Sequence, residues 1–239
     1  MCLALAGCIA VFSIFQKGGG SVKTKQLFDL SHTLARPLLE KSEYPWEILG
    51  EIKAFILELG KTLDPEKYDM VSENVWIAKS ATVFPSAYIG APCIIGENTE
   101  VRHCAFIRGS VLVGNNCVVG NSTEVKNSIV FDNVQIPHYN YVGDSVLGYK
   151  SHLGAGAITS NVKSDKTPVS VKTTDGKVET GLKKFGAMVG DGTEVGCNSV
   201  LCPGTVLGKN CTVYPLSRVR GYVPENRIYK SEKSIVVKL

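Results

Sequence analysis

The chain has 239 residues and a formal net charge of +4, and 44% of its residues are hydrophobic and 20% charged. This is the composition of a globular protein and excludes a disordered chain. The small positive excess, without a basic run or interleaved aromatic residues, argues against a nucleic-acid partner but suits a small anionic ligand. The eight cysteines contain no CxxC pair, and their spacings do not resemble a disulfide scaffold or a zinc ribbon.

Residues 1–21 combine an apolar run with a Gly-rich end. The run, residues 2–15, is shorter than the roughly 20 residues that a membrane-spanning helix needs. Its first cation is Lys17, so the positive start of a secretory signal is missing, and too few residues precede Cys8 for an export signal. We therefore expect no membrane association and a segment boundary near Ser21.

Residues 22–70 show helical periodicity. Leucines recur at helical spacing between residues 27 and 39, and Pro37 is expected to bend or end that helix. A second helix is expected to have Pro45 in its first turn and an apolar stripe from Trp46 to Leu59. This stripe predicts packing against the rest of the chain or against a neighbouring subunit.

Residues 71–220 contain a repeat of six residues, which we interpret as one domain. One aliphatic position recurs every six residues, slips by one twice, and resumes after an interruption: Ile77, Val83, Ile89, Ile95, Val101, Ile107, Val113, Val119, Val125; Val130, Ile136, Val142; Leu147, Leu153; then Val189, Val195, Leu201, Leu207, Val213, Val219. A small residue, such as Cys93 or Cys117, stands two positions earlier, and Gly often follows the aliphatic residue.

This period excludes an α-helix and predicts stacked coils of short parallel strands, a β-helix. The aliphatic residue fills the interior, the small residue fits near the turn, and Gly is expected to supply the dihedral freedom of the corner. Buried cysteines in the small position indicate packing and a reducing compartment, so we expect a cytoplasmic protein.

Two segments depart from the repeat. Residues 162–185 are polar, and the Asp175-Gly176 turn predicts a β-hairpin arm that projects from the coils. The tail, residues 221–239, is expected to pack on the outside of the β-helix.

The two slips, near Val130 and Leu147, coincide with a concentration of functional side chains that packing alone does not require: Arg108, Glu124, Lys126, His138, Tyr141, His152 and Asn161. Around them, the segments from His138 to Ser145 and from Gly154 to Asn161 resemble the acetyltransferase domain of bifunctional N-acetylglucosamine-1-phosphate uridylyltransferases. They are also similar to the archaeal sugar-1-phosphate nucleotidylyltransferases that carry an acetyltransferase domain. The resemblance covers roughly residues 75–230.

The resemblance implies an all-β, left-handed parallel β-helix of the hexapeptide-repeat class, with a short N-terminal helical segment and a protruding arm. It implies transfer of an acetyl group from acetyl-CoA, as co-substrate, to the amine of glucosamine- or galactosamine-1-phosphate by a homotrimer, with no metal in that step. By position in the motif, the implied catalytic residues are His138 as general base, Glu124 and Asn161. The implied substrate-binding residues are Arg108, Lys126 and Tyr141, and the implied oxyanion or donor residues are Ala155, Cys197 and Lys166.

The donor side departs from the family pattern. Cys197 and Pro215 replace small residues, the lysine that should follow the Asn is replaced by Lys163 or Lys166 in the arm, and the stretch before residue 70 has no nucleotide loop. An alternative is therefore a non-catalytic trimeric β-helix that binds a sugar phosphate or nucleotide, or that partners a separate sugar nucleotidyltransferase. A zinc enzyme with three histidines is a third possibility, disfavoured because His138 and His152 are fourteen residues apart.

Overall fold

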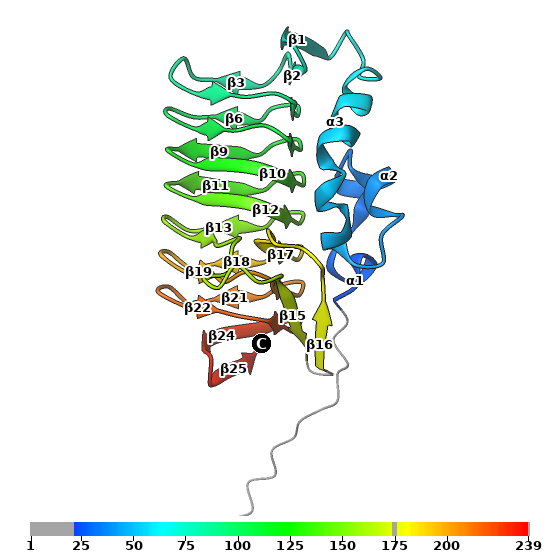
Figure 1. Cartoon of the computed structure of the whole chain (residues 1–239). Helices are drawn as coiled ribbons and strands as arrows, with labels where there is room; N and C mark the ends of the chain where they lie inside the picture. The colour runs from blue at the N-terminus through cyan, green and yellow to red at the C-terminus, as the bar shows by residue number, and fades with distance from the viewer. Residues whose placement is uncertain (1–21, 174–175, 239) are drawn as a thin grey trace, which may run out of the picture.

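The computed structural model describes residues 22–173 and 176–238, and the expectations for residues 1–21 lie outside these residues. The chain forms a left-handed parallel β-helix of about eight turns, with short helices along one side (Figure 1). The predicted fold class is confirmed.

Each full coil has three short strands, one on each of three faces that are separated by three corners. Face 1 is formed by β4 (Tyr88–Ile89), β7 (Phe106–Ile107), β14 (Ile158–Thr159), β19 (Val200–Leu201) and β22 (Arg218–Val219), with the first residues of β10 (Glu124–Val130) and β12 (Tyr141–Leu147). Face 2 is formed by the remainder of β10 and β12 with β2 (Val75–Ala78), β5 (Cys93–Ile95), β8 (Val111–Val113), β17 (Ala187–Val189), β20 (Thr205–Leu207) and β23 (Tyr222–Val223). Because β10 and β12 cross the corner between them, the described strands of faces 1 and 2, with β1 (Tyr68–Ser72), make up one 14-stranded sheet.

Face 3 is a separate sheet. Its nine described strands are β3 (Thr82–Val83), β6 (Glu100–Val101), β9 (Val118–Asn121), β11 (Gln135–His138), β13 (His152–Leu153), β18 (Glu194–Val195), β21 (Thr212–Val213), β24 (Arg227–Ser231) and β25 (Ser234–Val237). The predicted repeat positions point inward and form the core: Val101, Ile107, Val113, Val119 and Val125 are all fully buried. Burial of one continuous aliphatic column supplies the main stabilisation of such a fold.

The corners correct the expected role of glycine. Asparagines such as Asn98, Asn116 and Asn210 take the left-handed conformation there, with φ of 57°, 55° and 55°. Gly120 lies instead where the next coil passes closest, because a Cβ on it would lie 1.6 Å from the Pro137 carbonyl oxygen. Many of the periodic glycines are therefore required by close packing of backbone against backbone rather than by dihedral freedom.

The helical segment consists of several short pieces rather than two helices. They are α1 (Thr24–Leu27), the 3₁₀ turn η1 (Leu30–His32), α2 (Arg36–Leu39), the 3₁₀ helix η2 (Pro45–Gly50) and α3 (Ile52–Gly60). Pro37 was expected to bend or end a helix, but it lies in the first turn of α2. The backbone N–H that proline lacks would have no partner within the helix at that position, so its loss breaks no hydrogen bond. None of the helices in residues 22–173 and 176–238 is long and apolar enough to cross a membrane.

These helices cover face 2. α3 lies against β5, β8 and β10, and η2 lies against β12. Figure 1 shows α3 alongside the coils at the level of β10. Ile52 and Ile56 of the predicted stripe are fully buried, and Phe28 contacts Phe131 with ring centroids 5.2 Å apart. The stripe therefore packs on its own chain.

The arm and the tail are more closely joined to the coils than the sequence suggested. The predicted hairpin is present as β15 (Ser170–Thr173) and β16 (Gly176–Glu179), but Val169 and Val171 at its base are fully buried. The tail continues the β-helix, because β23 and β24 pair in parallel with β20 and β21, and β25 then pairs antiparallel with β24 at the end.

Replacing Gly120 by Ala is expected to destabilise the protein by about 3 kcal/mol, because neither the glycine nor the Pro137 backbone can move within the stacked coils. Gly50→Ala is the matched control. A Cβ at that position would meet no other atom within 4 Å, so the variant should be neutral or stabilise by about 0.5 kcal/mol. Urea unfolding of both variants measures this difference, and equal midpoints for the two would refute the close-packing explanation.

Candidate functional site

The site lies where two successive coils are one residue short. Cys93 pairs with Val111, 18 residues later, but Val111 pairs with Ser128 and Ser128 with Ser145, each only 17 residues later. The missing residue falls at the corner between faces 1 and 2, so β10 and β12 run across it, with φ of 43° at Asn127 and 49° at Asp144. The two slips in the sequence are these short corners.

Face 1 brings together one group of predicted residues. Glu124 and Tyr141 are directly paired in adjacent strands, and Arg108 Nη1 donates a hydrogen bond to Glu124 Oε1 at 2.8 Å. This bond raises the pKa of the Arg108 guanidinium. Burial raises the pKa of the Tyr141 phenol, and a hydrogen bond from Asn161 acts in the opposite direction. Gly143 makes room for this group, since a Cβ there would lie 2.6 Å from the Tyr141 hydroxyl.

Lys126 has a partner that sequence reasoning missed, the carboxylate of Asp144. Lys126 Nζ lies 3.0 Å from Asp144 Oδ2, and the Asp144 side chain is only 5% exposed. Asn127 donates to the other carboxylate oxygen at 2.8 Å, and Asn161 donates to Oδ2. The sequence signal for Asp144 was its spacing of 17 residues from an asparagine on each side, Asn127 and Asn161. This spacing can be recognised only when the length of the short coils is known.

His138 lies at another corner, between faces 3 and 1. Its side chain is exposed, and its backbone N–H donates to Asn140 Oδ1 at 3.0 Å. The Asn140 side chain is buried and donates to the Gly154 carbonyl at 2.8 Å and to the Ala157 carbonyl at 3.0 Å, which ties this corner to the next. His138 is therefore held on a well-anchored turn although its imidazole faces solvent.

The predicted donor residues are only partly brought together. Gly156 N–H donates to the His138 carbonyl, and Asn198 N–H donates to the Ala155 carbonyl, so His138, Ala155 and Cys197 occupy equivalent corner positions in successive coils. Lys166 is not at one of these corner positions, but is exposed in the turn at the start of the arm. Within residues 22–173 and 176–238, no hydrogen bond joins the His138 side chain to Glu124 or Asn161.

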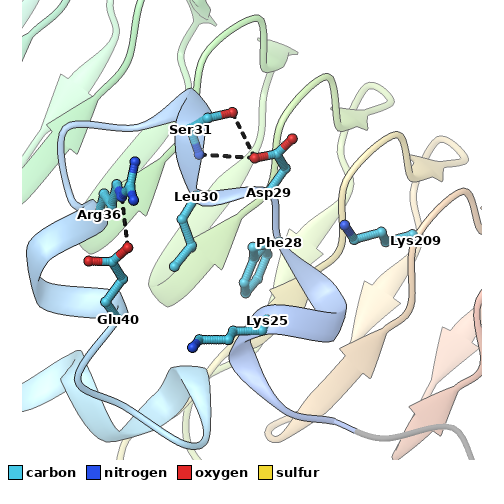
Figure 2. A pocket seen from close by; sticks show the side chains of 8 residues that line it. All are labelled: Lys25, Phe28, Asp29, Leu30, Ser31, Arg36, Glu40 and Lys209. Atoms are coloured by element: carbon cyan, nitrogen blue, oxygen red, sulfur yellow. Dashed lines mark hydrogen bonds and ion pairs between the residues drawn. The ribbon is translucent and has the colours of Figure 1, made fainter.

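A hollow in the surface lies away from this site. A pocket of about 430 Å³ lies between the helical segment and Lys209, and Lys25, Phe28 and Arg36 are among its lining residues (Figure 2). Arg36 is paired with Glu40 at 2.7 Å, and Lys209 with Asp191 at 3.2 Å, so two of its cations are already neutralised. This pocket contains none of the residues predicted for acyl transfer.

His103 and His152 each have a partner outside the candidate site. His152 Nδ1 lies 2.7 Å from Glu194 Oε2 on face 3, and His103 Nδ1 lies 3.2 Å from the Ser86 hydroxyl. In the part of the chain that the structure describes, no three His, Cys, Asp or Glu side chains gather as metal ligands would.

Comparison with known proteins gives the family. The family model described as the GMPPB C-terminal domain matches residues 92–234, which include every predicted site residue. The chain belongs to this family. The predicted resemblance, to bifunctional sugar nucleotidylyltransferases that carry an acetyltransferase domain, is confirmed by the relatives that match this chain.

Two relatives match different shares of this chain. The bifunctional protein GlmU of Methanococcus maripaludis is 32% identical over 198 residues, which are 82% of this chain and 48% of that protein. The bifunctional sugar-1-phosphate nucleotidylyltransferase/acetyltransferase of Sulfurisphaera tokodaii is 31% identical over 105 residues, which are 44% of this chain and 26% of that protein. The chain thus spans about half or less of the length of these relatives.

Among solved structures, the UDP-N-acetylglucosamine O-acyltransferase LpxA of Moraxella catarrhalis matches 66% of this chain and 70% of its own length. The sequence identity is 15% and the TM-score 0.38.

The cysteines should differ sharply in reactivity because the thiolate is the reacting form. Cys104 and Cys197 are exposed, whereas burial raises the pKa of Cys117 to about 12 and that of Cys211 to about 11. We expect iodoacetamide, followed by peptide mass spectrometry, to label Cys104 and Cys197 at least about 100-fold faster than Cys117 in the folded protein. Rapid labelling of Cys117 without unfolding would contradict the predicted packing role.

Proposed function

We propose that the chain is an N-acetyltransferase that moves an acetyl group from acetyl-CoA to the amine of an amino-sugar-1-phosphate, of the glucosamine or galactosamine type. The observation that carries this proposal is the polar group of Arg108, Glu124 and Tyr141, which lie on three adjacent coils at face 1. His138 lies at the corner that leads into this face, three residues before Tyr141. A β-helix that only packs needs no such group on an open face.

The acceptor would lie across the short corners. Arg108 and Lys126 would contact its phosphate as charge-assisted donors, and Tyr141 and Asn161 would contact the sugar. Glu124 lies between the Arg108 and Tyr141 side chains and would orient the amine. The fit of these residue types to a polar, anionic sugar supports this assignment.

The reaction needs no covalent intermediate on the protein. The amine nitrogen attacks the thioester carbonyl, His138 takes the amine proton as general base, the new C–N bond forms, and the C–S bond breaks to release CoA as its thiol. An exposed imidazole on an anchored corner suits this task, because it can reach a bound amine and exchange its proton with solvent. The backbone N–H near Ala155, one coil further, would stabilise the oxyanion.

The donor, acetyl-CoA, would follow the corner column from His138 through Ala155 to Cys197. The exposure of Cys197 leaves room for a ligand at that corner, although a thiol replaces the usual small residue. Lys166 would contribute only to a distal part of CoA, since it lies in the arm. A homotrimer would complete the site with a neighbouring prism.

A second candidate is a non-catalytic β-helix that binds a sugar phosphate or nucleotide, or that partners a nucleotidyltransferase. One observation favours it: both cations assigned to the phosphate already have carboxylate partners, Arg108 with Glu124 and Lys126 with Asp144. A scaffold would retain these pairs for packing alone.

The deciding assay measures thiol release from acetyl-CoA in the presence of glucosamine-1-phosphate or galactosamine-1-phosphate. His138→Ala should lower kcat by about 10²- to 10⁴-fold, the contribution of a general base. His152→Ala is the matched control, because His152 is bound to Glu194 on face 3, and it should change kcat by less than about threefold. A folded trimer without turnover of either sugar would favour the second candidate.

The donor assignment has its own test. Saturating CoA should slow iodoacetamide labelling of Cys197 by about tenfold, because the ligand would cover that corner, and leave labelling of the exposed Cys104 unchanged. Equal protection of both thiols, or of neither, would remove Cys197 from the donor site.

A further inference from the structure

Asp144 is the least exposed charged group near the candidate site, and nothing in the proposed reaction uses it directly. It lies in the second of the two short corners, in the left-handed conformation with φ of 49°. Its side chain is 5% exposed, so its charge must be balanced by close partners.

Those partners form a short column. In coils of 17 residues, Asn127, Asp144 and Asn161 follow one another at the same corner, so the carboxylate lies between two amides. Asn127 Nδ2 donates to Asp144 Oδ1 at 2.8 Å, and Asn161 Nδ2 donates to Oδ2. Lys126 Nζ, from the residue before Asn127, also reaches Oδ2 at 3.0 Å.

Both carboxylate oxygens are therefore used, and two of the three donors are residues assigned to the acceptor. A third such residue lies beside the column, because a Cβ on Gly143 would lie 2.6 Å from the Tyr141 hydroxyl and 3.1 Å from Asn161 Nδ2. On its other side, Asn127 Nδ2 donates to the Leu49 carbonyl of η2 at 3.1 Å, which ties the helical segment to the same carboxylate.

We propose that Asp144 is the positioning residue of the acceptor site, holding Lys126 and Asn161 in place for the sugar phosphate and joining them to η2. This inference rests on the proposed function for its link to substrate, but the positioning itself does not depend on turnover. Asp144 touches no reacting atom and acts through its neighbours.

The chain offers a close control in Asp191, a second carboxylate with little exposure that pairs with a lysine. Asp191 lies 3.2 Å from Lys209 Nζ and accepts hydrogen bonds from the backbone of Asp29 and Tyr149, away from face 1. Asp144→Asn and Asp191→Asn thus remove the same charge from two similar environments, only one of which is in the candidate site.

The experiment measures steady-state kinetics and lysine labelling in wild type and in both variants. Asp144→Asn should raise KM for the amino-sugar phosphate at least tenfold, with kcat and KM for acetyl-CoA within about threefold, because it loosens binding rather than chemistry. Brief acylation with sulfo-N-hydroxysuccinimide acetate and mass spectrometry should show Lys126 labelled at least fivefold faster. Asp191→Asn should leave these values unchanged and instead accelerate the labelling of Lys209.

Unchanged labelling of Lys126 and unchanged KM in Asp144→Asn would overturn the proposal. If wild type turns over neither sugar, the proposed function fails, but the labelling of Lys126 still decides whether Asp144 positions it. If Asp144→Asn does not fold, Asn127→Ala replaces it, since that variant removes one donor without leaving an unpaired charge. Faster labelling of Lys126, by at least twofold, is then expected, and unchanged labelling overturns the proposal.

Discussion

The fold depends on one requirement: each strand of a coil must pair in register with the corresponding strand of the coil before it. Within each pair of parallel strands the register must be kept, because a shift of one residue would turn inward side chains outward. A coil can therefore lose a residue only at a corner. Two successive coils lose it at the same corner, so Val111, Ser128 and Ser145 stay in one stack. The irregularity that packing tolerates is the place where polar side chains gather.

The short corner also explains how a charge can be buried on a surface that is otherwise flat. With 17 residues per coil, Asn127 and Asp144 stand directly above one another, while Lys126 approaches from one position earlier. A full coil of 18 residues would align Lys126 with Asp144 and move the asparagine away. The coil length thus selects which polar groups meet, and the carboxylate obtains two amides and one ammonium as partners.

The sequence predicted the periodic part of the fold because a single inward position determines it, and residues such as Val101 and Val125 are buried as expected. It did not predict how the helical segment breaks, since an apolar stripe is satisfied by short turns that follow a flat sheet as well as by one long helix. It could not identify Asp144 either. An aspartate after glycine is typical of a turn, and its partner Asn127 becomes a neighbour only because the coil has 17 residues. The position of Lys166 could not be predicted either, because it lies in the arm, where the six-residue repeat is interrupted.

The charges around the short corners limit how an anionic acceptor can be recognised. Arg108 and Lys126 are each paired with a carboxylate, so these four side chains carry no net charge. A phosphate in the proposed site would share each cation with its carboxylate, and the exposed Arg108 would gain less from it than an unpaired cation does. Selection among sugars would then depend on the orientation of neutral donors, chiefly Asn161, which Asp144 holds, and Tyr141 beside it. In this arrangement the buried carboxylate sets geometry, and the surface charges mainly balance one another.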